Sequence, residues 1–172
     1  MVMARQDTRT PPGKGPVAQQ IRLYAGLVLF VFAATHFLNH ALGNISLEWA
    51  QKAQDLRLAV WWSWPGTILL YGALLLHVGF ALLRIAMRRT FRMPAWEALQ
   101  ILLGLAIPYL LIRHILMTRG AATRFDAVID YQHELSVLWP GSGLTQSVLL
   151  VIVWLHGCIG LHFWLRLKPW YP

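Results

Sequence analysis

Four stretches of apolar sequence, each long enough to cross a membrane, constrain the fold of this chain most. They cover residues 21–43, 66–87, 95–117 and 144–165. A helix needs about 20 apolar residues to cross a hydrocarbon core about 30 Å thick. Because every backbone N–H and C=O group in a bilayer needs a partner within the protein, each stretch is predicted to be a helix. Residues 21–172 are therefore predicted to form one domain, an all-α integral membrane protein with a bundle of four transmembrane helices.

The charged residues are distributed unevenly between the two sides of this predicted bundle. They make up 13% of the 172 residues and give a net charge of +8. Residues 5–22, 84–92 and 166–168, which are placed on one side, hold ten Lys and Arg residues, whereas the opposite side holds five basic and five acidic residues. Since basic residues gather on the cytoplasmic side of membrane proteins, both termini are predicted to be cytoplasmic. The sequence has basic residues but no recognisable nucleic-acid-binding motif, so a nucleic-acid partner is not expected.

The segments outside the four stretches have a different composition. Residues 1–20 are rich in Pro and Gly without apolar periodicity, which predicts a disordered cytoplasmic tail. Residues 45–65 place tryptophans among charged residues, which predicts a short helix in the membrane interface within the first outer loop. Ser63 and Pro65 are typical of the N-cap and the first turn of the next helix. The second outer segment, 118–143, is longer and polar.

Six of the seven histidines lie inside the four apolar stretches, and four of these form two pairs at matched depths. His40 and His114 lie toward the outer side, while His77 and His156 lie about seven residues nearer the cytoplasmic side. Seven residues of helix rise by about 10 Å, enough to stack two cofactors. Histidine inside a bilayer is a functional candidate, and imidazole is a common ligand of haem iron. We predict two haem b groups, an outer one held by His40 and His114 and an inner one held by His77 and His156.

Two further histidines and two arginines complete the candidate site. His36 precedes His40 by one turn on the same helix face, so either is a possible outer ligand, although depth favours His40. If His40 is the ligand, His36 lies beside the haem or in a quinone site. His162 lies near the cytoplasmic edge and is expected to be interfacial, with a quinone site as the alternative. Arg113 and Arg119 are candidates to bind haem propionates, because guanidinium groups match carboxylates in geometry.

Each histidine also has a simpler interpretation. Polar residues in membrane bundles commonly hydrogen-bond across helices, and a single histidine would be interpreted in this way. Four histidines at matched depths favour haem. Small residues one turn away, Ala73 and Ala81 around His77 and Gly160 after His156, leave room for a flat ring. His133, in the second outer segment, is expected to be a solvated loop residue.

Several segments resemble one protein family. These are THFLNHALG (35–43), PGTILLYGALLLH (65–77), MPAWEALQ (93–100) and WLHGCIGLHFWLR (154–166). They resemble the N-terminal membrane domain of certain bacterial class III adenylate cyclases, over roughly residues 20–172. That domain is in turn similar to the dihaem cytochrome b anchor of succinate dehydrogenase and fumarate reductase. The resemblance implies haem-ligand roles for four histidines, which are His40 (or His36), His77, His114 and His156.

The resemblance also implies a location and partners. The protein is expected to be a multi-pass, homodimeric protein of the bacterial inner membrane that responds to quinone or quinol. In the family, a ferredoxin-like domain and a cyclase domain follow the anchor on the cytoplasmic side of the same parent chain. This chain has one cysteine, Cys158, and none of the metal-binding aspartates of a cyclase, so it is not expected to make cyclic AMP by itself. It is expected to be a fragment, an isolated sensor domain or a standalone relative.

Three functions therefore compete. The first is a haem b-binding, quinone-responsive redox sensor that regulates cyclic AMP synthesis by a catalytic domain absent from this chain. The second is the cytochrome b anchor subunit of a respiratory complex similar to succinate dehydrogenase or fumarate reductase, which carries electrons to or from quinone. The third is a membrane anchor without a cofactor, in which the histidines serve as packing groups.

Overall fold

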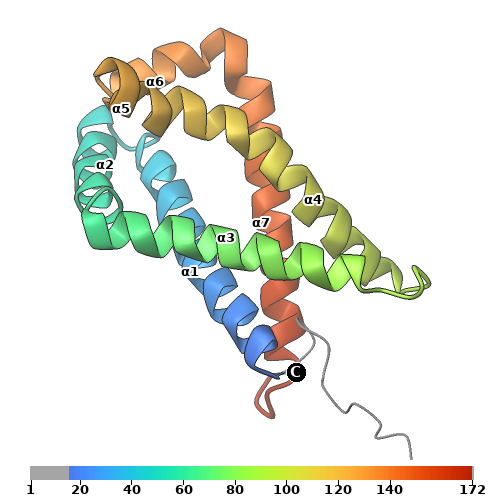
Figure 1. Ribbon diagram of the computed structural model, residues 1–172. Helices are drawn as coiled ribbons and strands as arrows, with labels where there is room; N and C mark the ends of the chain where they lie inside the picture. The colour runs from blue at the N-terminus through green and yellow to red at the C-terminus, as the bar shows by residue number, and fades with distance from the viewer. Residues whose placement is uncertain (1–15, 172) are drawn as a thin grey trace, which may run out of the picture.

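The computed structural model describes residues 16–171, and this part of the chain is helical apart from its turns and connecting segments. Figure 1 shows four long helices, α1 (Pro16–Leu42), α3 (Trp64–Ala86), α4 (Ala95–Ile115) and α7 (Gly143–Leu165). All four belong to helical segments that are long and apolar enough to cross a membrane. The predicted all-α class and the four long apolar helices are therefore confirmed.

Large apolar side chains on the outside of these helices are exposed. Ile68 on α3, Leu102 on α4 and Val151 on α7 have 63%, 65% and 52% of their surface accessible. A protein in water rarely leaves so much apolar surface uncovered, whereas lipid chains cover such a surface without penalty. The exposed surface is thus consistent with a multi-pass membrane protein.

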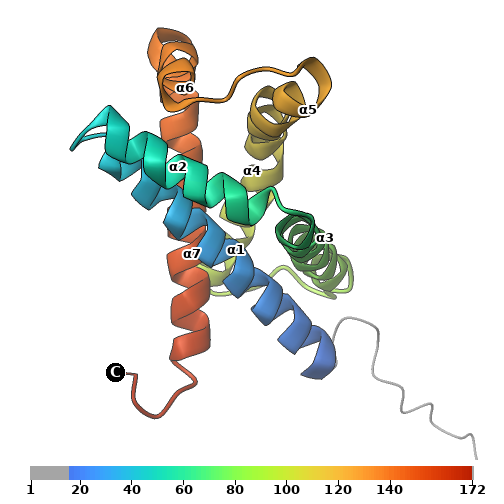
Figure 2. The same cartoon turned by 90° about the vertical axis from the view of Figure 1, so that its left-hand side faces the viewer.

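Shorter elements connect the long helices. α2 (Leu47–Trp61) follows α1, while the π-helix η1 (Leu116–Gly120) and α5 (Ala121–Phe125) prolong α4. α6 (Tyr131–Val137) and the π-helical segment η2 (Leu138–Ser142) precede α7. In both views α2, α5 and α6 lie together at the end of the bundle away from the C-terminus (Figures 1 and 2). We call this end the α2–α6 end.

Polar side chains fix the beginnings of three helices, and Ser46 does so for α2 by accepting from the N–H of Trp49 at 3.1 Å. Ser63 accepts a hydrogen bond from the backbone N–H of Gly66 at 3.1 Å, and Pro65 lies in the first turn of α3. This confirms the predicted N-cap and first turn. Asp130 caps α6 in the same way, since its Oδ1 accepts from the N–H of His133 at 2.6 Å. A cap of this kind satisfies one of the N–H groups that a helix leaves without an internal partner.

The structure differs from the sequence prediction in two segments, residues 16–20 and residues 118–143. α1 begins at Pro16, so residues 16–20 of the predicted tail are helical; proline suits a first helical turn and the Ala and Gln residues after it favour helix. Residues 1–15, which hold the rest of that tail, lie outside the described residues. The second outer segment, 118–143, is largely helical, because the α4 helix continues to Phe125 and Asp130 starts a new helix. His133 is consequently a residue of α6 and not of a loop, although it is exposed as predicted.

The long helices pack as two pairs. α1 packs against α3 and α4 packs against α7, while contacts between α1 and α7 join the pairs. Within residues 16–171, α1 does not pack against α4, and α3 does not pack against α7. Few residues are fully buried: Ala25, Asn39, Ala50, Gln54, Gly66, Ala73, Tyr131 and Leu149. The helices therefore enclose an interior that their own side chains do not fill.

Candidate functional site

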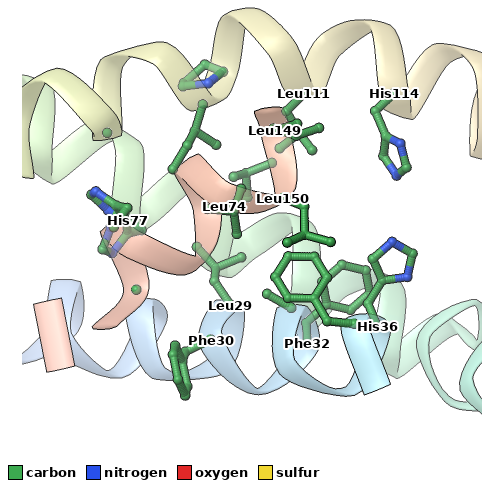
Figure 3. Close-up of a pocket in the computed structure, with 18 of the residues that line it drawn as sticks. Leu29, Phe30, Phe32, His36, Leu74, His77, Leu111, His114, Leu149 and Leu150 are labelled. Carbon is green, nitrogen blue, oxygen red and sulfur yellow. The ribbon is translucent and has the colours of Figure 1, made fainter. Parts of the chain in front are cut away.

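A cavity of about 2780 Å³ lies between the four long helices. Cavities that hold a drug-sized ligand measure about 300–1,000 Å³, so this one has room for more than one such ligand. All seven histidines line it, and five of them lie in the body of the bundle: His36, His40, His77, His114 and His156. Figure 3 shows His77 at one end and His36 and His114 at the other, with apolar side chains such as Leu74 and Leu150 between them.

His77 on α3 and His156 on α7 face each other across the cavity. Their ring centroids are 6.2 Å apart and their planes are inclined by 89°. Nδ1 of His77 lies 3.1 Å from the backbone oxygen of Arg22, and Nδ1 of His156 lies 3.2 Å from that of Gln100. A carbonyl oxygen only accepts, so each Nδ1 must carry the proton and donate. Each Nε2 then keeps the lone pair with which an imidazole binds a metal.

Each of these hydrogen bonds reaches a helix backbone beside a glycine. The accepting carbonyls lie one turn before Gly26 on α1 and Gly104 on α4. A Cβ atom at Gly26 would lie 3.0 Å from Cε1 and Nδ1 of His77, and one at Gly104 would lie 2.8 Å from Cε1 of His156. Because glycine has no side chain, the imidazole can approach the backbone closely. His77 on α3 thus contacts the backbone of α1, and His156 on α7 contacts the backbone of α4.

The second group of histidines lies nearer the α2–α6 end. His36 on α1 and His114 on α4 have ring centroids 5.9 Å apart, with planes inclined by 66°. Nδ1 of His114 lies 3.1 Å from Oε1 of Gln146, whereas the buried Nδ1 of His36 has no hydrogen-bond partner among residues 16–171. His40 contacts the rings of His36, at 4.6 Å, and of Tyr131, at 5.8 Å. The ring that faces His114 is therefore that of His36.

Both facing pairs join helices that do not pack against each other. One pair comes from α3 and α7 and the other from α1 and α4, which are the two combinations without direct packing within the described residues. The imidazoles therefore span the open interior of the bundle. Each pair thus connects two helices that share no direct packing within the described residues.

The separation of the rings fits a metal held on two opposite sides. Metal–nitrogen bonds of about 2.0 Å, with ring centres about 1.1 Å behind the nitrogens, place two opposite imidazole centres about 6 Å apart. The observed 6.2 Å and 5.9 Å agree with this separation. Within residues 16–171 there is no cluster of three or more His, Cys, Asp or Glu that could hold a bare metal ion. Two imidazoles per site suit a metal that arrives with its other ligands, as haem iron does.

The remaining predicted residues also line the cavity but lie outside the two histidine pairs. His162 is exposed on α7, and its Nδ1 lies 3.1 Å from the hydroxyl group of Tyr171. Arg113 is exposed at the edge of the cavity. Arg119 donates to Oγ1 of Thr67 at 3.1 Å and also lies over the ring of Trp62. The structure does not bring His162 near the other histidines of the bundle.

The sequence interpretation missed a buried polar cluster at the α2–α6 end. Asn39 and Gln54 are 3% and 0% exposed. Nδ2 of Asn39 donates to the backbone oxygen of Ala50 at 2.8 Å, and Nε of Arg57 donates to Oδ1 of Asn39 at 3.1 Å. Ala50, Gln54 and Arg57 follow each other at helical spacing, which could have identified this face of α2 as buried. The tryptophans of the segment had instead indicated an interfacial helix.

The function of this site has to be inferred from the two histidine pairs and the cavity between them, since no family model, curated protein or solved structure matches this chain.

Proposed function

We propose that this chain is a membrane domain that binds two haem b groups and exchanges single electrons through them. The main support is the pair of facing imidazoles at each end of a cavity of about 2780 Å³. The two pairs come from four different helices, and in each pair the rings are separated by the distance that a shared metal requires. A role in packing alone would not need four helices to hold imidazoles apart around an open space.

The residues of the chain have distinct roles in this proposal. His77 and His156 hold the inner haem, and His36 and His114 hold the outer one, with His40 as the alternative ligand. Their partners at Nδ1, which are backbone oxygens for His77 and His156 and a Gln side chain for His114, orient the rings and leave Nε2 toward the metal. Haem iron held by these histidines would supply one-electron chemistry.

The wall of the cavity between the two pairs is apolar. Leu29, Leu74 and Leu150 lie between the histidine pairs in Figure 3. Side chains of this kind exclude water and provide a medium of low dielectric constant around each site. Such surroundings tune a redox potential without contributing a ligand.

For the biological role we propose a quinone-responsive redox sensor that regulates a cyclase domain in the same parent chain. The resemblance of residues 35–43, 65–77 and 154–166 to the membrane domain of class III adenylate cyclases supports this role. A sensor needs two helix arrangements of similar energy, so that a change in redox state can shift their populations. The sparse packing between the α1–α3 pair and the α4–α7 pair is compatible with such a movement.

The respiratory alternative uses the same two haems as a path for electrons to or from quinone. Both histidine pairs line one cavity, which is compatible with electron transfer in a respiratory complex as well as with a sensor. Co-purification with flavoprotein and iron–sulfur subunits would support the respiratory role. A cyclase domain encoded in the same reading frame would support the sensor.

The experiment that tests haem binding is an optical spectrum of the detergent-purified chain with a measurement of haem per protein. We expect two low-spin b haems per chain, in both the oxidised and the dithionite-reduced forms. A chain that contains no haem after expression with ample haem supply would contradict the proposal. High-spin haem would contradict the assignment of two histidines to each iron.

A further inference from the structure

Arg57 is a cation held in place inside the bundle. It lies on α2 and lines the cavity, and its Nε donates to Oδ1 of Asn39 at 3.1 Å. Asn39 is itself fixed, because its Nδ2 donates to the backbone oxygen of Ala50 at 2.8 Å. Burial lowers the pKa of Arg57, and the nearby Glu134 carboxylate raises it. An arginine remains charged under all ordinary conditions, so this position of the cavity wall is cationic.

Among the residues that the structure describes, this cation has no close counter-ion. Within residues 16–171, no carboxylate oxygen lies within 4.0 Å of the Arg57 guanidinium. The Glu134 carboxylate is near enough to interact with Arg57, but its Oε1 lies 3.4 Å from Nε2 of Gln54. Arg57 is half-buried, and a charge taken out of water without a paired opposite charge is unfavourable. Within the described residues, the N–H groups on Nη1 and Nη2 of Arg57 therefore have no anionic acceptor.

The position of Arg57 relates it to the outer histidine pair. Its hydrogen-bond partner Asn39 lies three residues after His36 on α1, and Arg57, His36 and His114 all line the same cavity. Two buried polar atoms at the same end of the bundle, Nδ1 of His36 and Oε1 of Gln54, have no hydrogen-bond partner within residues 16–171. Native proteins rarely leave such atoms unsatisfied unless a ligand or water reaches them. The unpaired cation on the cavity wall points to a ligand with an acidic group at this end of the bundle.

We propose that Arg57 binds a carboxylate of the ligand that lies between His36 and His114. The inference depends on the proposed function, in which that carboxylate is a propionate of the outer haem. A guanidinium group held at Nε keeps its terminal N–H groups free to donate to both oxygens of one carboxylate. Arg57 thus takes the role that the sequence suggested for Arg113 and Arg119. Arg113 is exposed, and Arg119 already donates to Thr67.

The test compares haem with haem dimethyl ester, in which both carboxylates are neutral. The full chain carrying His77→Ala serves as the background, so that only the outer site remains. The chain is produced without haem and titrated with each compound, and binding is followed by the low-spin spectrum. We expect haem to bind about tenfold or more tightly than the ester, because a hydrogen bond to a charged group is worth about that factor. Arg57→Gln should remove this preference.

Control variants show whether a lost preference for haem is specific to Arg57. Lys52→Gln removes an exposed cation from the same helix and should leave the preference unchanged. If Arg57→Gln does not fold, Arg57→Met replaces it, because an apolar side chain of similar length often substitutes for a buried charge without loss of stability. A preference that persists in the Arg57 variant, or that disappears in Arg119→Gln instead, overturns the proposal.

The result also separates this inference from the proposed function. If the background chain binds haem and its dimethyl ester equally well, haem binding stands and the role of Arg57 is wrong. If it binds neither compound, and the chain without substitutions does not bind haem, the proposed function itself fails and the inference fails with it.

Discussion

Replacing Gly104 with alanine should displace His156 and remove one of the two haems. A Cβ atom at this position would lie 2.8 Å from Cε1 and 3.3 Å from Nδ1 of His156, whereas ordinary contact begins at 3.4 Å. The imidazole must therefore move away from α4. Its Nδ1 is already 3.2 Å from the backbone oxygen of Gln100, so the movement weakens or breaks that hydrogen bond. The ring would lose both its support and the partner that selects its tautomer.

The expected magnitude follows from two effects. Overpacking of a well-fitted contact raises the free energy of the folded state by about 1–3 kcal/mol. Loss of the hydrogen-bond partner of a metal-binding histidine lowers metal affinity by about 10–100-fold. Alanine is the better helix former by about 1 kcal/mol, so α4 itself should not unfold. We therefore expect the affinity for the inner haem to fall by about 10–100-fold in a protein that remains folded.

The assay is haem per protein with a low-spin spectrum after purification under limiting haem. Gly72→Ala is the matched control, because no heavy atom lies within 4 Å of a Cβ atom at Gly72 and that residue does not line the cavity. This control should keep both haems. Gly26→Ala, where the Cβ would lie 3.0 Å from the His77 ring, should affect the same haem as Gly104→Ala. A Gly104→Ala protein with two haems of unchanged affinity would refute the role assigned to the glycines.

Three further substitutions test the remaining parts of the site. His77→Ala should leave one low-spin haem of two; a chain that still carries both haems would show that His77 is not a ligand. His36→Ala should remove the outer haem while His40→Ala retains it, as judged by haem content, and the opposite result assigns the ligand to His40. Asn39→Ala removes hydrogen bonds of 2.8 Å and 3.1 Å in a buried cluster and should lower the free energy of unfolding by about 1–3 kcal/mol. Chemical denaturation in detergent measures that loss, and an unchanged midpoint would contradict it.

The helices were predictable because membrane crossing is a local property of sequence. A run of about 20 apolar residues is sufficient to predict a helix, and a side chain such as Ser63 marks where the next one begins. Depth along each helix also placed His77 beside His156, whose rings are 6.2 Å apart in the structure. Their role as ligands remains a prediction. Counting residues from a charged boundary was sufficient here because both histidines lie deep within their helices.

The same counting did not identify the histidine of α1 that faces His114. It treats the helices as parallel, whereas Figures 1 and 2 show long helices that cross at clear angles. A difference in tilt shifts the level at which side chains of two helices meet, and one turn of α1 separates His36 from His40. The ring that faces His114 is accordingly His36, which depth alone did not favour.

The supporting residues were less predictable, because their contacts are with other helices. The sequence drew attention to small residues beside each histidine on its own helix, such as Ala73 and Gly160. The close approaches are instead to Gly26 and Gly104 on the neighbouring helices. Arg57 was interpreted as a residue of an interfacial helix, since nothing in the sequence near it shows that Asn39 binds its Nε. Such pairings become visible only when the helices are placed in space.

The packing of the helices makes the ligand part of the fold. Direct packing joins α1 with α3 and α4 with α7, while the proposed haems lie between α3 and α7 and between α1 and α4. Each haem would therefore connect two helices that do not otherwise pack within residues 16–171. A ligand at 100 times its dissociation constant stabilises the folded state by about 2.7 kcal/mol per site. Removal of haem should lower the unfolding temperature of the chain, and His77→Ala should give an intermediate value. Equal unfolding temperatures for the loaded and the haem-free chain would mean that the four helices are held together without any ligand in the cavity.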